Sequence, residues 1–225
     1  MNPQSAIHNP QFRLYVFDLD GTLIDSRRDL ADSVNALLVE CGARALPEER
    51  VGRMVGDGAA TLVARAFEAS GIPKPDDALT RFLAIYAAHL TDHTRPYDGV
   101  TEMLEACRAR ARIAVLTNKP IGSTRTILDR LELARFFNET MVLGGDGPLP
   151  RKPDPAGLQW LMQAASVSPV ETLLVGDSMI DWRTARAAGA RFAVARYGFG
   201  FEGFPPERID RHDFIVDSPR AVFCL

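Results

Sequence analysis

The chain has 225 residues, of which 46% are hydrophobic and 24% charged, and its formal net charge is -3. These values suit one large domain or a core with a smaller insert. They argue against a strongly basic nucleic-acid-binding surface, and no apolar run is long enough to cross a membrane.

The N-terminal residues "MNPQSAIHNPQ" are polar and contain proline, so they resemble neither a signal peptide nor a membrane anchor. The three cysteines are far apart and form no CxxC pair, which is typical of reduced thiols. We therefore expect a cytoplasmic protein that has no nucleic-acid or membrane partner. No feature of the sequence indicates an oligomeric state.

Short apolar runs predict buried strands along the chain. They do not alternate with polar residues, as is typical of parallel strands that are covered on both faces. In chain order the runs are Leu14–Phe17, Ile113–Leu116, a weaker one at Met141–Leu143, Leu173–Val175, Phe192–Ala195 and Phe214–Val216.

Segments of helical length separate most of these runs. The predicted helices are Val100–Arg110, Ser123–Leu133, Ala156–Ala165 and Trp182–Ala188, the last one ended by Gly189. An alternation of strands and helices predicts an α/β fold with a doubly wound, mostly parallel sheet.

Residues 26 to 93 interrupt this alternation with helical patterns alone. Ser26 and Asp29 have the spacing of a capping box and would begin the first helix. The apolar positions of three helices are Leu30, Val34, Leu37 and Leu38; Leu62 and Ala66; and Leu79, Phe82, Leu83, Tyr86 and Leu90. We predict an α/β core domain of residues 1–24 and 95–225 and a helical cap domain of residues 25–94.

The stretch "LYVFDLDGTLIDS" places Asp18 and Asp20 directly after the first predicted strand. Alternate side chains of an extended chain point the same way, so the two carboxylates would crowd one place. Repulsion and loss of hydration would both oppose that arrangement. A bound cation would remove the difficulty.

Other polar side chains also follow predicted strands. Because ligands of open α/β sheets bind at the carboxyl ends of the strands, these side chains are candidates for one common site. They are Thr117, Asn118 and Lys119 after "IAVL", Asp177 and Asp181 after "TLLV", and Lys152 in the loop "RKPDP".

The chemistry of this set is that of a phosphate site with a hard metal ion. Several carboxylates without a histidine or cysteine cluster suit Mg²⁺ better than zinc. Hydroxyl and amide donors and a lysine beside the metal suit a phosphoryl group. One carboxylate can then attack phosphorus while a second transfers protons.

Lysine is scarce in this chain, since Lys74, Lys119 and Lys152 are the three lysines among 26 basic residues. Two of them fall in the segments just described. A compact ammonium is not interchangeable with a planar guanidinium, so these positions can require lysine.

The motifs "DLDGTL", "TNK", "RKPDP" and "GDSMID" resemble the four motifs of the haloacid dehalogenase-like phosphohydrolases. The resemblance extends from about Arg13 to Asp217. It implies a Rossmann-like core with a helical cap inserted after the first strand, in agreement with the organisation predicted above.

The resemblance also implies roles for the acidic residues. Asp18 would be the nucleophile and Asp20 the general acid and base. Mg²⁺ would be held by Asp18, the backbone carbonyl of Asp20, and Asp177, and Asp181 would support the metal site and the motif lysine.

For the phosphate, the resemblance implies that Thr117 and Asn118 hold the phosphoryl group. Lys152 would balance the charge of the nucleophile and of the phosphate.

Closer similarity indicates the phosphoglycolate phosphatase branch, through "TNKP", "GGD…RKPDPAGL" and "VGDGAATLVARAF". That resemblance implies that a cap loop containing Gly56 and Gly58 faces the active site, where Arg53 is the candidate to pair with a substrate carboxylate. Asp57 and Asp98 depart from the pattern of the branch. Both lie in or beside the cap, so the reaction is better indicated than the substrate, 2-phosphoglycolate.

Four alternatives remain beside this prediction. Pyrophosphatase or sugar-phosphate phosphatase activity would use the same machinery. A β-phosphoglucomutase-type isomerase typically carries a histidine after the first motif and a Ser-Arg pair in the cap loop, where this chain has "IDSRRDL" and "GDGAATL". A dehalogenase would lack Asp20, and a non-catalytic binding protein would not need the complete acidic set.

Overall fold

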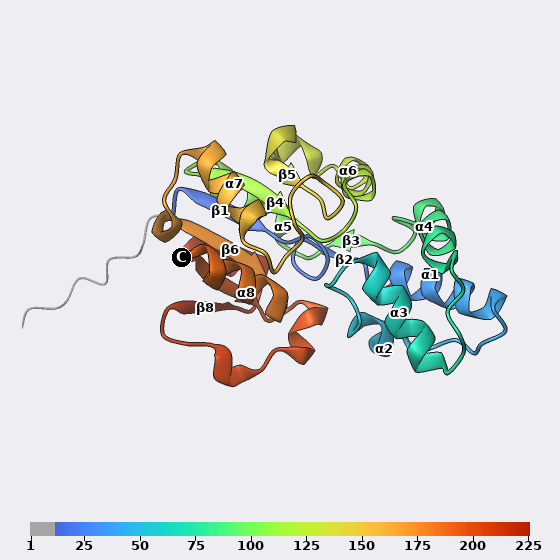
Figure 1. Ribbon diagram of the computed structural model, residues 1–225. Coiled ribbons are helices and arrows are strands. Elements are labelled where there is room, and N and C mark those ends of the chain that lie inside the picture. The colour runs from blue at the N-terminus through green and yellow to red at the C-terminus, as the bar shows by residue number, and fades with distance from the viewer. Residues whose placement is uncertain (1–11) are drawn as a thin grey trace, which may run out of the picture.

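The computed structural model describes residues 12–225, and the predictions made for the N-terminal segment lie outside the described residues. The core of the fold is a six-stranded sheet in the order β5-β4-β1-β6-β7-β8, with every pair of neighbours parallel (Figure 1). Its strands are β1 (Leu14–Phe17), β4 (Arg112–Leu116), β5 (Val142–Leu143), β6 (Thr172–Gly176), β7 (Arg191–Ala195) and β8 (Asp213–Val216).

The predicted strands are confirmed, with shifts of one residue at several ends. Met141 belongs to a short 3-10 helix rather than to β5. The central position of β1 decides where the site lies, because Val16 is in register with Ala114 of β4 and with Leu174 of β6. The segments that follow these three strands therefore emerge side by side.

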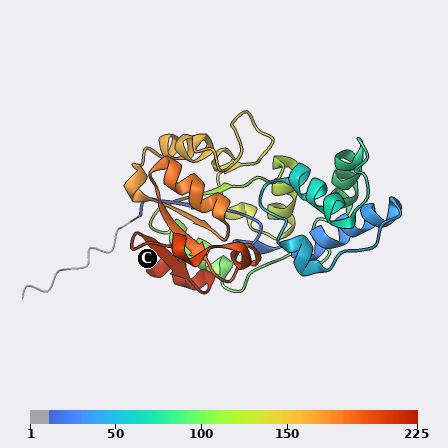
Figure 2. The same cartoon turned by 60° about the horizontal axis from the view of Figure 1, so that its bottom comes forward.

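Helices cover both faces of the sheet, as the doubly wound prediction required. Odd-numbered β1 residues such as Tyr15 pack in one apolar cluster with α5 (Val100–Arg108) and α6 (Ile121–Arg130). Even-numbered residues such as Val16 pack in a second cluster with α7 (Ala156–Ala165) and α8 (Met179–Ala188), which lie on the other side of the strands (Figure 2).

Helix α8 begins three residues before its predicted start at Trp182. Ser178 and Asp181 form a capping box at its N-terminus. The Ser178 side chain accepts the backbone N–H of Asp181, and the Asp181 side chain accepts the backbone N–H of Ser178. The sequence had marked Asp181 only as a site residue, and its capping role explains the earlier start.

The insert after β1 is helical, and its helices lie together at one end of the core (Figure 1). The predicted helices are α1 (Arg27–Glu40), α3 (Ala59–Ser70) and α4 (Ala78–Ala88), and a further short helix is α2 (Glu48–Gly52). Five residues are too few to show a helical period, so α2 was not predicted. At the two crossings into the core, β2 (Ile24–Asp25) pairs with β3 (Arg95–Pro96) as an antiparallel ribbon.

The predicted capping box at the start of α1 is wrong. Ser26 makes no cap hydrogen bond, and its hydroxyl donates to Asp20 instead. The carboxylate of Asp29 accepts the backbone N–H groups of His93 and Thr94 and the hydroxyl of Thr94. Asp29 therefore fastens the end of the insert to its beginning, a contact between distant segments that local spacing cannot indicate.

Within residues 12–225, every helix is too short or too polar to pass through a lipid bilayer.

Candidate active site

The site begins at the carboxyl end of β1. Asp18 follows the strand directly, and its backbone N–H donates to the carbonyl of Val175 on β6. The chain then turns at Gly21, where φ is +83° and a Cβ atom would lie 1.8 Å from Oδ2 of Asp177. Glycine is required here by both the left-handed backbone and the close approach of Asp177.

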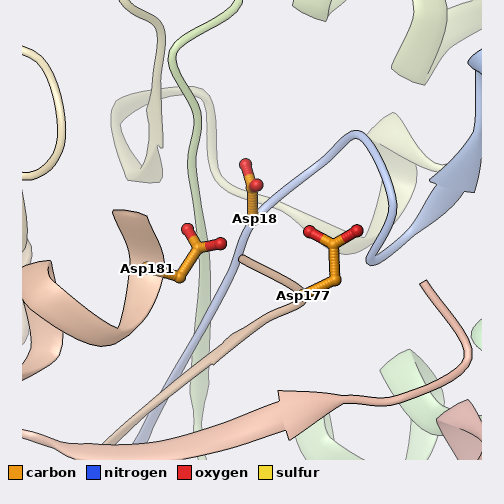
Figure 3. Close-up of side chains that lie close together, drawn as sticks. All are labelled: Asp18, Asp177 and Asp181. Atoms are coloured by element: carbon orange, nitrogen blue, oxygen red, sulfur yellow. The ribbon is translucent and has the colours of Figure 1, made fainter. Parts of the chain in front are cut away.

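Three buried carboxylates converge beside this turn. Oxygens of Asp18, Asp177 and Asp181 lie within 4.8 Å of one another, and none of the three residues is more than 6% exposed. Figure 3 shows them on three separate segments: the ends of β1 and β6, and the first turn of α8. Neighbouring strands and one helix N-terminus thus build an acidic cluster that no single segment contains.

Lys152 supplies a positive charge to this cluster. Its Nζ lies 2.8 Å from Oδ1 of Asp18 and 2.6 Å from Oδ1 of Asp181. The lysine side chain is 2% exposed, and a buried ammonium is tolerated only when anions and hydrogen bonds replace its lost hydration. Lys152 is therefore committed to two specific carboxylates.

One lysine does not neutralise three carboxylates, and the pKa values of Asp18 and Asp177 are raised. Burial, assisted by the charges of Asp181 and Asp20 against the opposing effect of Lys152, raises the pKa of Asp18 to about 7. Burial and the charges of Asp181 and Asp18 raise the pKa of Asp177 well above its usual range. A further cation would relieve this excess of negative charge, and the donors are all hard oxygens. The acidic cluster can thus hold a divalent metal ion.

Thr117 and Asn118 follow β4 and lie at the junction of core and insert. The side-chain amide of Asn118 donates to the carbonyl of Gly56 in the insert at 3.0 Å and to the carbonyl of Lys152 at 2.9 Å. Its Oδ1 is buried and has no hydrogen-bond partner among residues 12–225. Thr117 Oγ1 accepts the N–H of Lys119, so the hydroxyl proton can be donated elsewhere.

Asp20 occupies a different place from the three clustered carboxylates. Both of its oxygens lie 2.9 Å from Nζ of Lys119, and the hydroxyl of Ser26 donates to Oδ1 at 2.5 Å. The ammonium of Lys119 also lies 4.6 Å from the ring centroid of Tyr86 on α4. Asp20 is thus held by a buried ion pair that extends to the helical insert.

A pocket between the core and the insert joins these groups. Its core side contains the two carboxylates of the first motif and the segment after β4. Its other side is mainly apolar. The lining residues are Asp18, Asp20, Thr117, Asn118, Lys119 and Pro120 from the core, and Leu30, Val55, Gly56, Gly58, Ala59, Leu62, Phe82, Leu83 and Tyr86 from the insert.

The sequence of the chain matches a known family of proteins. The family model for haloacid dehalogenase-like hydrolases matches residues 15–195, which is well over half of the chain. The chain belongs to this family. The helical insert after β1 is the cap domain of such a hydrolase, and the predicted fold and family are confirmed.

Known members of the family are similar over most of their length. A phosphoglycolate phosphatase from Rhodospirillum rubrum is 44% identical over 196 residues, which cover 83% of this chain and 80% of that protein. One from Pseudomonas putida is 40% identical over 217 residues, covering 93% of this chain and 78% of that protein. The crystal structure of a predicted phosphoglycolate phosphatase from Haemophilus somnus superposes with a TM-score of 0.86 at 31% identity, covering 95% of this chain and 97% of that chain.

In this haloacid dehalogenase-like hydrolase, the core residues predicted from the motifs lie together. Asp18, Asp20, Thr117 and Asn118 line the pocket, and Asp177, Asp181 and Lys152 lie behind Asp18. Sequence spacing could not separate Asp20 from the other carboxylates, whereas the structure shows that its side chain is paired with Lys119.

The predicted cap residues divide into two groups. Gly56 and Gly58 line the pocket. Gly58 has φ +87°, and a Cβ atom there would lie 3.0 Å from Nη1 of Arg151. Arg53 is not among the lining residues, and its Nη1 lies 3.3 Å from Oε2 of Glu202 in the core domain. Its contact with substrate stays a prediction.

The sequence placed Lys119 among the strand-end candidates without a specific task and gave Tyr86 no place in the site, although both line the pocket. The scarcity of lysine had marked Lys119 as unusual. Tyr86 had been placed only on the apolar face of a helix, where its hydroxyl has no influence on the periodicity.

Proposed function

We propose that this hydrolase is a Mg²⁺-dependent phosphoglycolate phosphatase that acts through an aspartyl-phosphate intermediate. The observation that carries the proposal is that Asp18 lines a pocket under the insert and lies beside Lys152 and two further buried carboxylates. The names of the relatives support the substrate, since several proteins that are 38% to 44% identical to this chain are phosphoglycolate phosphatases.

The acidic cluster fits a magnesium ion. We assign its protein ligands as Asp18, the backbone carbonyl of Asp20, and Asp177, with Asp181 supporting the site through Lys152. Mg²⁺ prefers oxygen ligands, and the raised pKa values of Asp18 and Asp177, caused first by burial and then by neighbouring carboxylates, are of the kind that a bound cation would reverse. When bound, the ion would neutralise phosphate charge and keep these carboxylates ionised.

Asp18 attacks phosphorus in the first step. A new bond forms between a carboxylate oxygen and phosphorus while the bond from phosphorus to the ester oxygen breaks. Lys152 fixes the other oxygen of Asp18 at 2.8 Å and offsets the charge that gathers around the phosphoryl group.

The segment after β4 holds the phosphoryl group. The Thr117 hydroxyl can donate its proton to a phosphoryl oxygen, since Oγ1 already accepts the backbone N–H of Lys119. The side-chain amide of Asn118 donates its two protons to the carbonyls of Gly56 and Lys152. It therefore contributes to phosphate binding by fixing the cap loop and the lysine loop around the group.

Asp20 transfers protons in both steps. For this role Asp20 enters the cycle protonated, gives that proton to the leaving ester oxygen as glycolate departs, and regains a proton from the water that attacks the phosphorylated Asp18. The hydroxyl of Ser26 holds its carboxylate at the pocket wall. This position lets Asp20 act on the leaving group while Asp18 acts on phosphorus.

The cap closes the pocket and excludes water from the reacting phosphoryl group. We propose residues 25–94 as this cap and residues 1–24 and 95–225 as the core, a division supported by the β2–β3 ribbon at the two crossings. Gly56 and Gly58 form the part of the cap loop nearest the core. A cytoplasmic location is inferred from the reduced character of the cysteines.

The test is a panel of small phosphates assayed with Mg²⁺ and with EDTA. We expect kcat/KM to be highest for 2-phosphoglycolate, lower for sugar phosphates and pyrophosphate, and close to zero for all of them with EDTA. Turnover that survives metal removal would contradict the mechanism. A sugar phosphate or pyrophosphate as the best substrate would contradict the assignment of phosphoglycolate and leave the phosphatase chemistry in place.

A further inference from the structure

The substrate named above places a demand on the pocket. In 2-phosphoglycolate the carboxylate is separated from the phosphate by a single methylene group. When the phosphoryl group lies against Asp18, the carboxylate must therefore lie within the same pocket. Burying a carboxylate is costly unless a cation and hydrogen-bond donors receive it.

The described residues that line the pocket include one cation, Lys119. The cap side of the wall is dominated by apolar side chains such as Leu62 and Phe82. Lys152 does not line the pocket, and its ammonium contacts Asp18 and Asp181 instead. A substrate carboxylate in this pocket thus has Lys119 as its cationic partner.

The Lys119 ammonium keeps one N–H group beyond those that Asp20 receives, and it lies beside the Tyr86 oxygen, where a ligand oxygen can share it. An ammonium has three N–H groups, and the two oxygens of Asp20 receive two of them. Burial lowers the pKa of a lysine, but the charge of Asp20 and the oxygen of Tyr86 outweigh it here, so the pKa of Lys119 is raised. The side chain is 4% exposed, which strengthens its attraction for an anion because little water screens it.

Tyr86 offers a second donor beside Lys119. Its hydroxyl is buried, and the Lys119 ammonium beside it can donate only to the oxygen. The O–H proton has no acceptor among residues 12–225, although buried hydroxyl groups nearly always have one. Burial is the main cause that raises the pKa of Tyr86 to about 12, so the hydroxyl keeps its proton. A ligand oxygen would supply the missing partner.

We propose that Lys119 and Tyr86 together recognise the carboxylate of the substrate and so determine the preference for a carboxylated phosphomonoester. This inference rests on the proposed function. Lys119 comes from the segment after β4 and Tyr86 from α4, so the pair forms only when cap and core meet. The same contact then couples substrate recognition to closure of the pocket.

The test compares two substrates of similar size, 2-phosphoglycolate and 2-hydroxyethyl phosphate, which carries a neutral hydroxymethyl group in place of the carboxylate. The selectivity is the ratio of their kcat/KM values. Damage to Asp20 or to the fold lowers both values and cancels in the ratio. Loss of carboxylate recognition lowers only the value for phosphoglycolate.

We expect Lys119→Met to lower the selectivity about 100-fold and Tyr86→Phe about 10-fold, as is typical for losing a charged and a neutral donor to a carboxylate. Tyr86→Phe keeps the ring and its stacking on Phe82, so it folds even if the lysine variant does not. Lys74→Met is the matched control, because Lys74 is exposed on the cap, and it should leave the ratio unchanged.

Three outcomes would overturn the inference. In the first, both variants lose activity equally toward the two substrates, which would make Lys119 only a positioning residue for Asp20. In the second, Arg53→Ala lowers the ratio and the Lys119 variant does not, which would transfer the role to Arg53. In the third, the unmodified enzyme hydrolyses both substrates equally well, which would remove phosphoglycolate as the preferred substrate while leaving the phosphatase mechanism intact.

Discussion

The core side of the pocket and the cap side are built from opposite kinds of residue. On the core side, Asp18, Asp177, Asp181 and Lys152 are charged, buried and linked to one another by short contacts. On the cap side, the wall is mainly apolar. This difference indicates a division of labour in which the core performs the phosphoryl chemistry and the cap selects and encloses the substrate.

Several specific contacts join the cap to the core. The Asn118 amide donates to the Gly56 carbonyl, and the Lys119 ammonium lies against the Tyr86 ring. Exposed Arg53 pairs with Glu202, a contact of small energetic value because water screens it. Substitutions on the core side should therefore lower the activity toward every substrate. Substitutions on the cap side should impair closure of the pocket or change the preference between substrates.

The largest expected effect follows from Asp18→Asn. Without a carboxylate nucleophile, kcat should fall by at least about 10⁴-fold for every phosphomonoester. Steady-state assays with 2-phosphoglycolate and an aryl phosphate would measure it. Asp32→Asn is the control, since Asp32 is an exposed aspartate of α1 and its replacement should keep full activity. An Asp18 variant with more than a tenth of the normal rate would refute its role.

The next largest effect is expected when a metal ligand is replaced, and it concerns the Mg²⁺ concentration that activity requires. Asp177→Asn removes one of the clustered carboxylates, and the Mg²⁺ concentration for half-maximal activity should rise about 100-fold or more. A titration with Mg²⁺ at saturating substrate measures this. If the variant needs the same Mg²⁺ concentration as the unmodified enzyme, Asp177 is not a ligand.

A cap-side effect should be smaller and should appear as impaired closure. In Gly58→Ala the new Cβ atom would lie 3.0 Å from Nη1 of Arg151 and 3.4 Å from the carbonyl oxygen of Asn118. We expect kcat/KM to fall about 10-fold for all small phosphates, because the loop can no longer lie against the core.

Gly71→Ala is a matched control for that variant. Gly71 ends the helix that Gly58 begins and also has a positive φ, and nothing lies within 4 Å of a Cβ atom there. Its backbone is in the left-handed region (φ +72°, ψ 17°), whereas Gly58 has φ +87° and ψ 166°, which only glycine adopts readily, so part of the loss in Gly58→Ala is backbone strain. Gly71→Ala should lose about 1 kcal/mol of unfolding free energy in urea and retain its activity. Equal losses of activity in both variants would show that backbone strain, rather than contact with the core, causes the effect.

The smallest expected effect is the pH dependence of the stability of the metal-free protein. The carboxyl of Asp18 has its pKa raised from 3.8 to about 7 in the folded protein, so between these values the folded state holds a proton that the unfolded state has released. Stability from this group is therefore lost as pH rises through that window. We expect the melting temperature in EDTA to fall between about pH 5 and about pH 8.

Mg²⁺ should reverse this trend, because the ion favours the ionised carboxylates. Its stabilising effect should thus be larger at the upper end of that range than at the lower end. Thermal melts with Mg²⁺ and with EDTA at several pH values measure both effects. A melting temperature in EDTA that rises with pH would contradict the raised pKa values of Asp18 and Asp177.

The fold was predictable because its signals are local. Uniformly apolar runs marked every strand of the sheet, and helical spacing marked the three longer helices of the cap. The short helix α2 and the β2–β3 ribbon were missed because five and two residues carry no period. Asp29 was misjudged because its partners, His93 and Thr94, are more than sixty positions away in sequence.

The proximity of the core candidate residues was predictable on the same basis, while their roles stay predictions. The motifs supplied the residue types at the strand ends, and the rule that parallel strands end at one edge brought them together. The pairing of Asp20 with Lys119, and the hydrogen bonds from Asn118 to two loops, were not predictable. Side-chain partners depend on how the segments pack, and several partners are compatible with the same spacing.

The sequence by itself determined the order of strands and helices, the presence of an inserted cap, and the identity of the groups that can perform phosphoryl transfer. These properties depend on hydrophobic periodicity and on residue chemistry, and both can be read from the sequence. Only the tertiary structure decided which charges are paired and which residues line the pocket. Lys119 meets Tyr86 across the pocket because the cap folds back onto the core, and that approach arises from packing between segments that are distant in sequence.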